Sequence, residues 1–322
     1  MRYYNNILEL VGNTPLIRIN RLSAGLDPLI LAKAEFLNPG GSIKDRIGKP
    51  MIEAAEREGK LNPGWTIVEP TSGNTGVGLA LVALLKGYKL AFTMPDKMSM
   101  EKENLLKAFG GKVVRTPTAV EPDDPRSYYK IAEKMVEEIG TAYSPNQYFN
   151  PNNPRAHYET TGPEIWRDTD GKVTHLVCGM GTGGTISGAG KYLKEMNPDI
   201  KIIGVDPEGS IYHEEFYKTH GEVHTYKTEG IGEDFIPPTI DLSIIDEIVI
   251  VGDKEAFLTA RRLTQEEGLF VGSSSGAAMY GALEVAKKAD KDAVIVVILP
   301  DTGRNYLSTL YNDEWMKNQG FL

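Results

Sequence analysis

The sequence predicts an α/β fold with two lobes and mostly parallel sheets. Short runs of β-branched residues, bounded by glycine or proline, alternate with longer stretches that have the apolar spacing of a helix. Strands separated by helical segments usually form a parallel sheet, in which ligands bind beyond the carboxyl ends of the strands. The length of 322 residues is sufficient for two lobes.

The expected strands follow one another at the spacing of repeated strand–helix units. They are residues 29–34, 66–69, 89–94, 112–116, 175–179, 201–205, 247–251 and 293–299. Helices are expected between most of them. Residues 144–154 form a loop rich in Pro and Asn, which we interpret as a boundary between the lobes.

Composition and charge favour small-molecule partners. The formal net charge is −9, and the charged residues are scattered, which argues against binding to nucleic acid or to an anionic membrane. Cys178 is the single cysteine, which excludes an internal disulfide and fits a reducing cytoplasm. The N-terminal residues lack the features of a secretion signal, and no apolar run is long enough to span a bilayer. The five histidines are not expected to form a metal site.

A glycine-rich turn, GMGTGG at 179–184, predicts a phosphate-binding site. It follows an expected strand and precedes an expected helix, and Asp206 ends the next strand, so the pattern also fits an NAD site. The backbone N–H groups at such a helix start bind any phosphate, however. The hydroxyls of Thr182 and Thr185 favour a monophosphate. A tight turn without a ligand is the alternative.

A second motif, NPGGSIKDR at 38–46, places Lys44 at the start of an expected helix, with Ser42 as its cap. The positive end of a helix favours the neutral form of an amine, which is needed to form an imine and then to act as a base. The alternative is a surface lysine paired with Asp45.

Two further helix starts are rich in small polar residues. In TSGNTG at 71–76, hydroxyl and amide side chains and unpaired N–H groups form a nest that suits a carboxylate. In GSSSG at 272–276, a serine is placed to donate a hydrogen bond to a neutral ring nitrogen. Ordinary capped helix starts are the alternative for both segments.

In this order, the four motifs resemble the fold type II pyridoxal phosphate enzymes, specifically the cysteine synthase and cystathionine β-synthase family. The resemblance covers nearly the whole chain, from VGNTPL at 11–16 through KMS at 97–99 and GIG at 230–232 to SSG at 274–276. GVDPEGS at 204–210, EGIGEDFIP at 229–237 and residues 300–322 are most similar to the catalytic core of the cystathionine β-synthases. HYETTGPEIW at 157–166 is equally typical of cysteine synthases.

The resemblance implies a two-lobed architecture like that of the tryptophan synthase β subunit. Residues 1–35 and 147–322 would form the larger lobe, which binds pyridoxal phosphate. Residues 36–146 would form a smaller N-terminal lobe that closes over the substrate. A homodimer is also implied. Because the sequence opens directly on the catalytic motifs, without the haem-binding extension of animal relatives, we expect no haem.

The resemblance also implies a role for each matching residue. Lys44 would be the catalytic residue and would hold the cofactor as an imine. The other cofactor-binding residues would be Asn74 at the ring hydroxyl, Gly181, Thr182, Gly183, Gly184 and Thr185 at the phosphate, and Ser274 at the ring nitrogen. The substrate carboxylate would be bound by Thr71, Ser72, Thr75 and Gln147, and Gly230 and Glu233 would contact substrate. Glu233 departs from the aromatic residue of many eukaryotic relatives, and a solvated loop carboxylate is the alternative reading.

The implied reaction is a β-replacement that joins L-serine, or an activated serine, to L-homocysteine and yields L-cystathionine. Release of hydrogen sulfide from cysteine is a further expected outcome. The first alternative is a cysteine synthase that uses O-acetylserine and sulfide. A catalytically inactive binding protein is opposed by the presence of Lys44, and an NAD oxidoreductase leaves the other motifs without a purpose.

Overall fold

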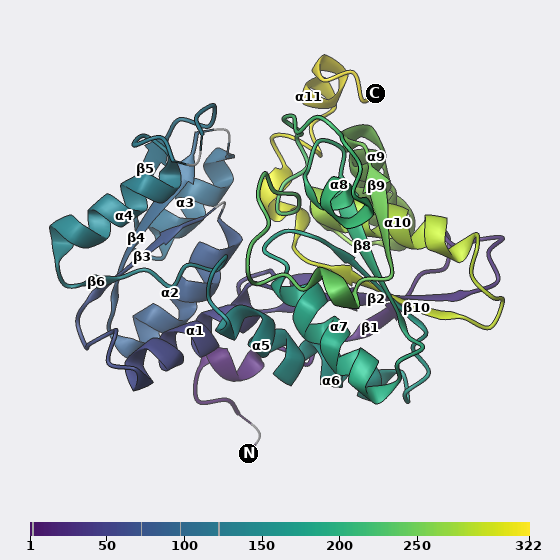
Figure 1. The fold of residues 1–322 in the computed structure, drawn as a ribbon, viewed down its shortest axis with the longest axis horizontal. Coiled ribbons are helices and arrows are strands. Elements are labelled where there is room, and N and C mark those ends of the chain that lie inside the picture. Colours follow the sequence, from purple (N-terminus) through teal and green to yellow (C-terminus); the bar gives the residue numbers. More distant parts are fainter. Residues whose placement is uncertain (2, 72, 97, 122) are drawn as a thin grey trace. The chain divides into compact units, whose positions relative to one another are not determined.

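The computed structural model describes residues 1, 3–71, 73–96, 98–121 and 123–322. The chain divides into two compact units. The first unit comprises Met1–Val11 and Asn38–Asn152, and the second comprises Gly12–Leu37 and Asn153–Leu322. Each unit has its own sheet flanked by helices (Figure 1), so the predicted α/β class is confirmed.

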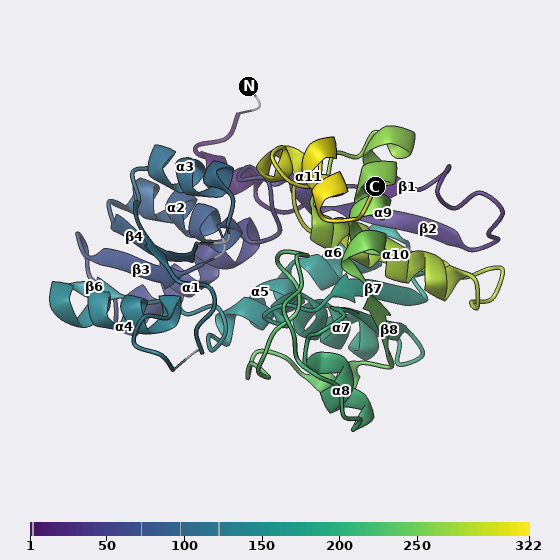
Figure 2. The same ribbon diagram turned by 90° about the horizontal axis from the view of Figure 1, so that it is seen from above.

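The sheet of the first unit is parallel, with strand order β5-β4-β3-β6. Figure 2 shows α2 and α3 on one side of β3 and β4, with α4 on the other. On the α4 side, Val68 and Ala91 of the strands pack against Ala132. The elements of this unit are η1 (Ile7–Leu10), α1 (Asp45–Arg57), β3 (Thr66–Pro70), α2 (Asn74–Lys86), β4 (Lys89–Pro95), α3 (Met100–Ala108), β5 (Lys112–Thr116), α4 (Tyr128–Ile139) and β6 (Ala142–Tyr143).

The sheet of the second unit has the order β1-β2-β10-β7-β8-β9, parallel except for β1. Figure 1 shows α9 and α10 on one face and α6 and α7 on the other. Its elements are β1 (Leu16–Arg18), β2 (Leu29–Ala34), η2 (Glu35–Leu37), α5 (Asn152–Glu159), α6 (Thr161–Asp168), β7 (His175–Gly179), α7 (Gly184–Met196), β8 (Lys201–Pro207), α8 (Tyr212–Tyr217), η3 (Leu242–Ile244), β9 (Glu247–Val251), α9 (Asp253–Glu267), α10 (Ser273–Ala286), β10 (Val294–Leu299), η4 (Gly303–Tyr306) and α11 (Asp313–Asn318).

The expected strands are all present, with ends that differ by two residues at most. The sequence did not reveal β1 and β6, because strands of three and two residues carry too few side chains to show alternation. The core of the second unit lies between its sheet and α10, where Val177 and Val297 meet small residues such as Ala278. Small side chains let this helix approach the strands closely.

In the first unit, α1 and α2 are in backbone contact. A Cβ atom on Gly48 would lie 2.3 Å from the carbonyl oxygen of Gly78, and a Cβ atom on Gly78 would lie 2.4 Å from the carbonyl oxygen of Lys44. Any side chain at either position would therefore force the two helices apart. The contact joins the start of α1, where Lys44 lies, to the first turns of α2.

We expect Gly78→Ala to lower the free energy of unfolding by about 1–3 kcal/mol, the usual cost of overpacking. In a helix without this contact, the same change would stabilise by about 1 kcal/mol, because alanine is the better helix former. Urea denaturation followed by circular dichroism measures the sign of this change in the free energy of unfolding. A variant more stable than the wild type would show that the helices tolerate separation.

Candidate functional site

In the second unit, the predicted glycine turn joins β7 to the N-terminus of α7. Gly183 caps the helix with a φ of +77°, a left-handed conformation that side chains other than glycine rarely adopt. A Cβ atom on Gly184 would lie 1.9 Å from the side-chain oxygen of Asn153. The turn is thus a narrow backbone cradle at the positive end of a 13-residue helix, which suits a phosphate.

Side chains from distant segments hold this turn in place. Asn153 donates from Nδ2 to Thr182 Oγ1 at 2.9 Å, and Thr239 donates its hydroxyl to the Thr182 carbonyl at 2.6 Å. The Thr185 hydroxyl lies 3.3 Å from His157 Nε2. The fully buried Tyr212 donates its hydroxyl to the carbonyl of Gly181. Sequence reasoning missed Asn153, His157, Tyr212 and Thr239, because their contacts cross 28 to 57 residues and leave no local motif.

The structure brings the predicted residues Gly181, Gly230 and Ser274 together. A Cβ atom on Gly181 would lie 2.7 Å from the carbonyl oxygen of Gly230, and one on Gly230 would lie 3.8 Å from Ser274 Oγ. Ser274 is buried in the first turn of α10. The hydroxyl of Ser273, beside it, accepts the N–H of Glu229 at 3.1 Å, which ties the GIG segment to this helix start. One end of the cradle is therefore adjacent to a serine hydroxyl.

Glu233 follows the GIG segment, and its backbone is fixed on both sides. Its N–H donates to Ser210 Oγ at 3.1 Å, and its carbonyl accepts the N–H of Ile211 at 3.0 Å. The residue is half-buried.

Asp206, the acid that an NAD site would require for a ribose, is fully buried. It accepts the backbone N–H of His213 at 3.0 Å. Burial raises the pKa of its carboxyl to about 6, while hydrogen bonds from Ser210 and His213 act in the opposite direction. Asp206 binds the start of α8, and its complete burial argues against the dinucleotide interpretation of the glycine turn.

In the first unit, Lys44 is the N-cap residue of α1 and is half-buried. The expectation that Ser42 caps this helix is wrong, because the helix begins at Asp45 and its N-cap residue is Lys44. Ser42 Oγ instead accepts the N–H of Lys44 at 3.2 Å, in the turn that precedes the helix. The buried Asp45 carboxylate accepts the N–H of Gly40 at 2.5 Å. Asp45 therefore closes the Pro-Gly-Gly turn, which fixes the backbone from which Lys44 projects.

The TSGNTG segment lies at the junction of β3 and α2. Asn74 and Thr75 are the first residues of α2, and Thr71 directly follows β3. Ser72, also predicted to bind substrate, lies outside the described residues. The expectation of unpaired N–H groups is wrong in part, because the N–H groups of Gly73 and Gly76 donate to Thr71 Oγ1 at 3.0 and 3.4 Å.

The remaining predicted residue of this group, Gln147, is joined to the start of α2. Thr75 donates its hydroxyl to Gln147 Oε1 at 2.7 Å, and both side chains are buried. Behind them lies Glu69 of β3, which sequence reasoning missed. Its carboxylate accepts the backbone N–H groups of Asn146 at 2.8 Å and Gln147 at 3.0 Å.

Burial dominates the ionisation of Glu69. It raises the pKa of this carboxyl to about 7, although the two N–H donors favour the charged form and lower it. Tyr143, on the neighbouring strand β6, has a pKa that burial raises first and that Glu58 and Glu69 raise further. A carboxyl that titrates near neutrality therefore lies directly behind the predicted carboxylate-binding residues.

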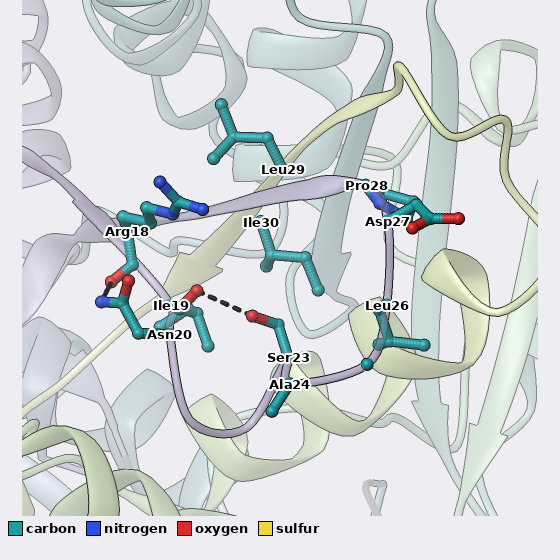
Figure 3. Close-up of a pocket in the computed structure, with 11 residues that line it drawn as sticks. Arg18, Ile19, Asn20, Ser23, Ala24, Leu26, Asp27, Pro28, Leu29 and Ile30 are labelled. Atoms are coloured by element: carbon teal, nitrogen blue, oxygen red, sulfur yellow. Dashed lines mark hydrogen bonds between the residues drawn. The ribbon is translucent and has the colours of Figure 1, made fainter.

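A hollow of about 250 Å³ in the second unit lies elsewhere. It is formed by the loop between β1 and β2 (Figure 3), where the Ser23 hydroxyl donates to the Ile19 carbonyl at 2.8 Å. This loop enters β2 at Leu29, which pairs with the first residue of the parallel strand β10. The hollow is thus at the amino edge of the sheet, opposite the glycine turn, and contains none of the predicted site residues.

The part of the chain that the structure describes contains neither a candidate membrane-spanning helix nor a candidate cluster of metal ligands. None of the helices there combines the length and apolar character that a membrane crossing requires. Within the same ranges, no group of three or more His, Cys, Asp or Glu side chains is arranged to hold a metal ion.

Comparison with known proteins places this geometry in a family. A family model described as "Pyridoxal-phosphate dependent enzyme" matches residues 7–301. The chain belongs to this family. It is 49% identical over 319 residues to cystathionine β-synthase of Apis mellifera, covering 98% of this chain and 63% of the relative. For the Rattus norvegicus cystathionine β-synthase the identity is 50% over 319 residues, covering 98% of this chain and 57% of the relative. The chain thus spans less than two thirds of the length of these relatives.

Solved structures share the fold over nearly their entire length. An O-acetylserine-dependent cystathionine β-synthase from Helicobacter pylori matches with a TM-score of 0.88 and 39% identity, covering 96% of this chain and 99% of that one. A hydrogen sulfide-producing enzyme from Fusobacterium nucleatum matches with a TM-score of 0.87 and 39% identity, covering 95% and 98%. The predicted family and the fold type II architecture are confirmed, and family membership implies pyridoxal phosphate as the cofactor.

The raised pKa of Glu69 predicts how stability depends on pH. The folded-state pKa of about 7 exceeds the ordinary value of 4.5, so the folded protein binds this proton more readily than the unfolded chain does. Relative to Glu69→Gln, the wild type should be most stable below pH 4.5 and should lose stability as the pH rises to about 7. At about 1.4 kcal/mol per pH unit, the loss approaches about 3 kcal/mol.

Urea denaturation of both proteins at several pH values measures this difference. The two free energies of unfolding are compared at each pH, so any offset from the substitution itself cancels in the slope. Parallel curves for wild type and Glu69→Gln would contradict the assignment.

Proposed function

We propose that this protein is a pyridoxal phosphate-dependent cystathionine β-synthase, which joins L-serine to L-homocysteine and forms L-cystathionine. The observation that carries the proposal is the phosphate cradle at the start of α7, with Gly230 and Ser274 beside it. Support comes from the family match and from relatives named cystathionine β-synthase that are aligned over 98% of this chain.

The residues present fit the cofactor. We propose that the turn from Gly181 to Thr185 binds its phosphate and that Ser274 faces its ring nitrogen. Asn74 would bind the ring hydroxyl and Lys44 would hold the aldehyde carbon. When bound, pyridoxal phosphate supplies an electron sink that makes the Cα proton of an amino acid acidic. Lys44 belongs to the first unit and the glycine turn to the second. That both bind the same cofactor molecule is therefore part of the proposal.

The chain's own residues would then bind substrate and move one proton. We propose that Thr71, Ser72, Thr75 and Gln147 bind the carboxylate of the donor amino acid. Lys44 Nζ would take the proton from Cα, and the β-hydroxyl would take a proton from solvent and leave as water. The thiol of homocysteine would give its proton to solvent as its sulfur forms a bond to Cβ, and Lys44 Nζ would return the first proton to Cα. Gly230 and Glu233 would contact the second substrate, with the Glu233 carboxylate near its amino group.

A second donor is favoured by one comparison. The Helicobacter pylori structure is that of an O-acetylserine-dependent enzyme, and it covers 96% of this chain. This supports O-acetylserine as an alternative donor for cystathionine formation. The use of O-acetylserine with sulfide, the reaction of a cysteine synthase, is the alternative function. The Fusobacterium nucleatum enzyme produces hydrogen sulfide, and we propose release of hydrogen sulfide from cysteine as a side reaction of this chain.

The proposal extends to the state of the protein. We propose a homodimer in the cytoplasm that acts on small amino acids without haem. The single cysteine, which is buried, is compatible with a reducing compartment. A molar mass of one chain, measured by light scattering, would contradict the homodimer. A haem absorption band in the purified protein would contradict the absence of haem.

Lys44→Ala should abolish the absorption band of the imine in the protein loaded with pyridoxal phosphate, because no other amine would form the imine at this position. The phosphate cradle is intact in the variant, so the cofactor should still bind, with an affinity reduced about tenfold or more. Absorption spectra and equilibrium dialysis measure the two effects separately. Lys49→Ala, on the exposed side of α1, is the matched control and should retain the wild-type spectrum.

Steady-state assays with two donors and two acceptors decide between the functions. Serine with homocysteine should give a kcat/KM at least about tenfold above that of O-acetylserine with sulfide, since each mismatched substrate loses transition-state contacts. If the enzyme accepted sulfide but not homocysteine, the cystathionine β-synthase assignment would be wrong and the protein would be a cysteine synthase.

A further inference from the structure

Glu69 is a buried charged residue without an assigned role in the proposed reaction. Its side chain is fully buried in β3. Val68, the preceding residue, packs against Ala132 of α4. Because neighbouring side chains of a strand point to opposite faces, Glu69 points away from α4. A buried carboxylate is costly unless its oxygens accept strong hydrogen bonds. The hydrogen-bond partners of Glu69 therefore indicate its role.

Those partners are two consecutive backbone N–H groups. Glu69 Oε2 accepts from Asn146 at 2.8 Å and Oε1 accepts from Gln147 at 3.0 Å. Each oxygen therefore holds one peptide group, and the pair fixes both the position and the orientation of this short segment. The contact crosses 77 and 78 residues of sequence, from the sheet to the loop after β6.

The segment that Glu69 holds contains a residue in an uncommon backbone conformation. Asn146 has a φ of +50°, a left-handed conformation that is uncommon for a residue other than glycine. Its carbonyl accepts the N–H groups of Phe149 and Asn150, so the chain turns sharply there. A strained backbone persists when its surroundings hold it in more than one place.

The turn at Asn146, once it is held by Glu69, orients Gln147. The Gln147 N–H donates to Glu69, and Gln147 Oε1 accepts a hydrogen bond from the Thr75 hydroxyl at 2.7 Å. A continuous path of hydrogen bonds therefore runs from the Glu69 carboxylate through the Gln147 residue to the first turn of α2. Gln147 and Thr75 are the residues to which the proposed function assigns the donor carboxylate.

We propose that Glu69 is a positioning residue for the amino-acid donor. Its carboxylate sets the place of Gln147, and the Thr75 hydroxyl holds Gln147 Oε1. The amide NH2 group of Gln147 then meets the donor carboxylate without rearrangement. Glu69 itself touches neither substrate nor cofactor in this scheme. The inference rests on the proposed function, because it concerns the binding of the same donor.

The decisive variant is Glu69→Gln, which keeps the size of the side chain. An amide has one acceptor oxygen, and its NH2 group faces the second N–H, so one of the two bonds is lost. At about pH 8, we expect the KM for serine to rise about tenfold while kcat changes less than about threefold, the pattern of lost ground-state binding. The dissociation constant of serine, from the spectral shift of the loaded enzyme, should rise in parallel.

A measurement on the cofactor-free protein tests the same contact without turnover. Amide hydrogen exchange of Asn146 or Gln147 should become about tenfold faster or more in Glu69→Gln, because the amide that faces the new NH2 group loses its hydrogen bond. Glu56→Gln is the matched control. Glu56 binds Lys86 Nζ at 2.8 Å and the Tyr88 hydroxyl at 2.6 Å in the same unit, away from this turn. It should leave KM and these exchange rates unchanged.

Glu69→Asp separates geometry from charge and replaces Glu69→Gln should that variant not fold. It retains the negative charge but withdraws the oxygens by one methylene group, so it should also raise the KM for serine. Wild-type KM and exchange rates in the variants would overturn the inference, as would a fall in kcat at unchanged KM. If the wild type itself neither bound nor turned over serine, the proposed function would fail instead, and the exchange rates would still report on the contact.

Discussion

The backbone contact between α1 and α2 is the constraint on which the candidate site of the first unit depends. With glycine at positions 48 and 78, the two helices approach until the Lys44 carbonyl lies against α2. Lys44 and Asn74 are thirty residues apart in sequence, and both lie at the first residues of their helices. Because the helices cannot separate without losing this contact, the backbone of Lys44 keeps a constant position relative to the polar start of α2.

The second unit uses a similar solution for the phosphate cradle. Asn153, Tyr212 and Thr239, from three other segments, hold two carbonyls and one hydroxyl of its glycine turn. Pre-organisation of this kind matters for a ligand with several charged oxygens, because N–H donors already in place need no ordering when the ligand binds. The cradle is rigid through its neighbours rather than through its own sequence.

Buried ionisable groups have different roles in the two units. Asp206 and Glu69 both have a pKa raised by burial, and both accept backbone N–H groups. Asp206 fixes the start of α8 and removes the support for a ribose site, whereas Glu69 fixes the turn that contains Gln147. A perturbed pKa alone therefore does not identify a catalytic group. The partners of each carboxylate decide which role it has.

The sequence by itself determined the alternation of strands and helices, the position of Lys44 at a helix start, and the glycine turn, because each depends on residues within a few positions of one another. It did not reveal that Ser42 lies outside the cap position, that Thr71 occupies two N–H groups of its own nest, or that Glu69 lies behind Gln147. Only the tertiary structure decided these points. A hydrogen bond that joins residues 78 positions apart, or a side chain that folds back on its own loop, depends on how the chain packs, and no periodicity or motif records it.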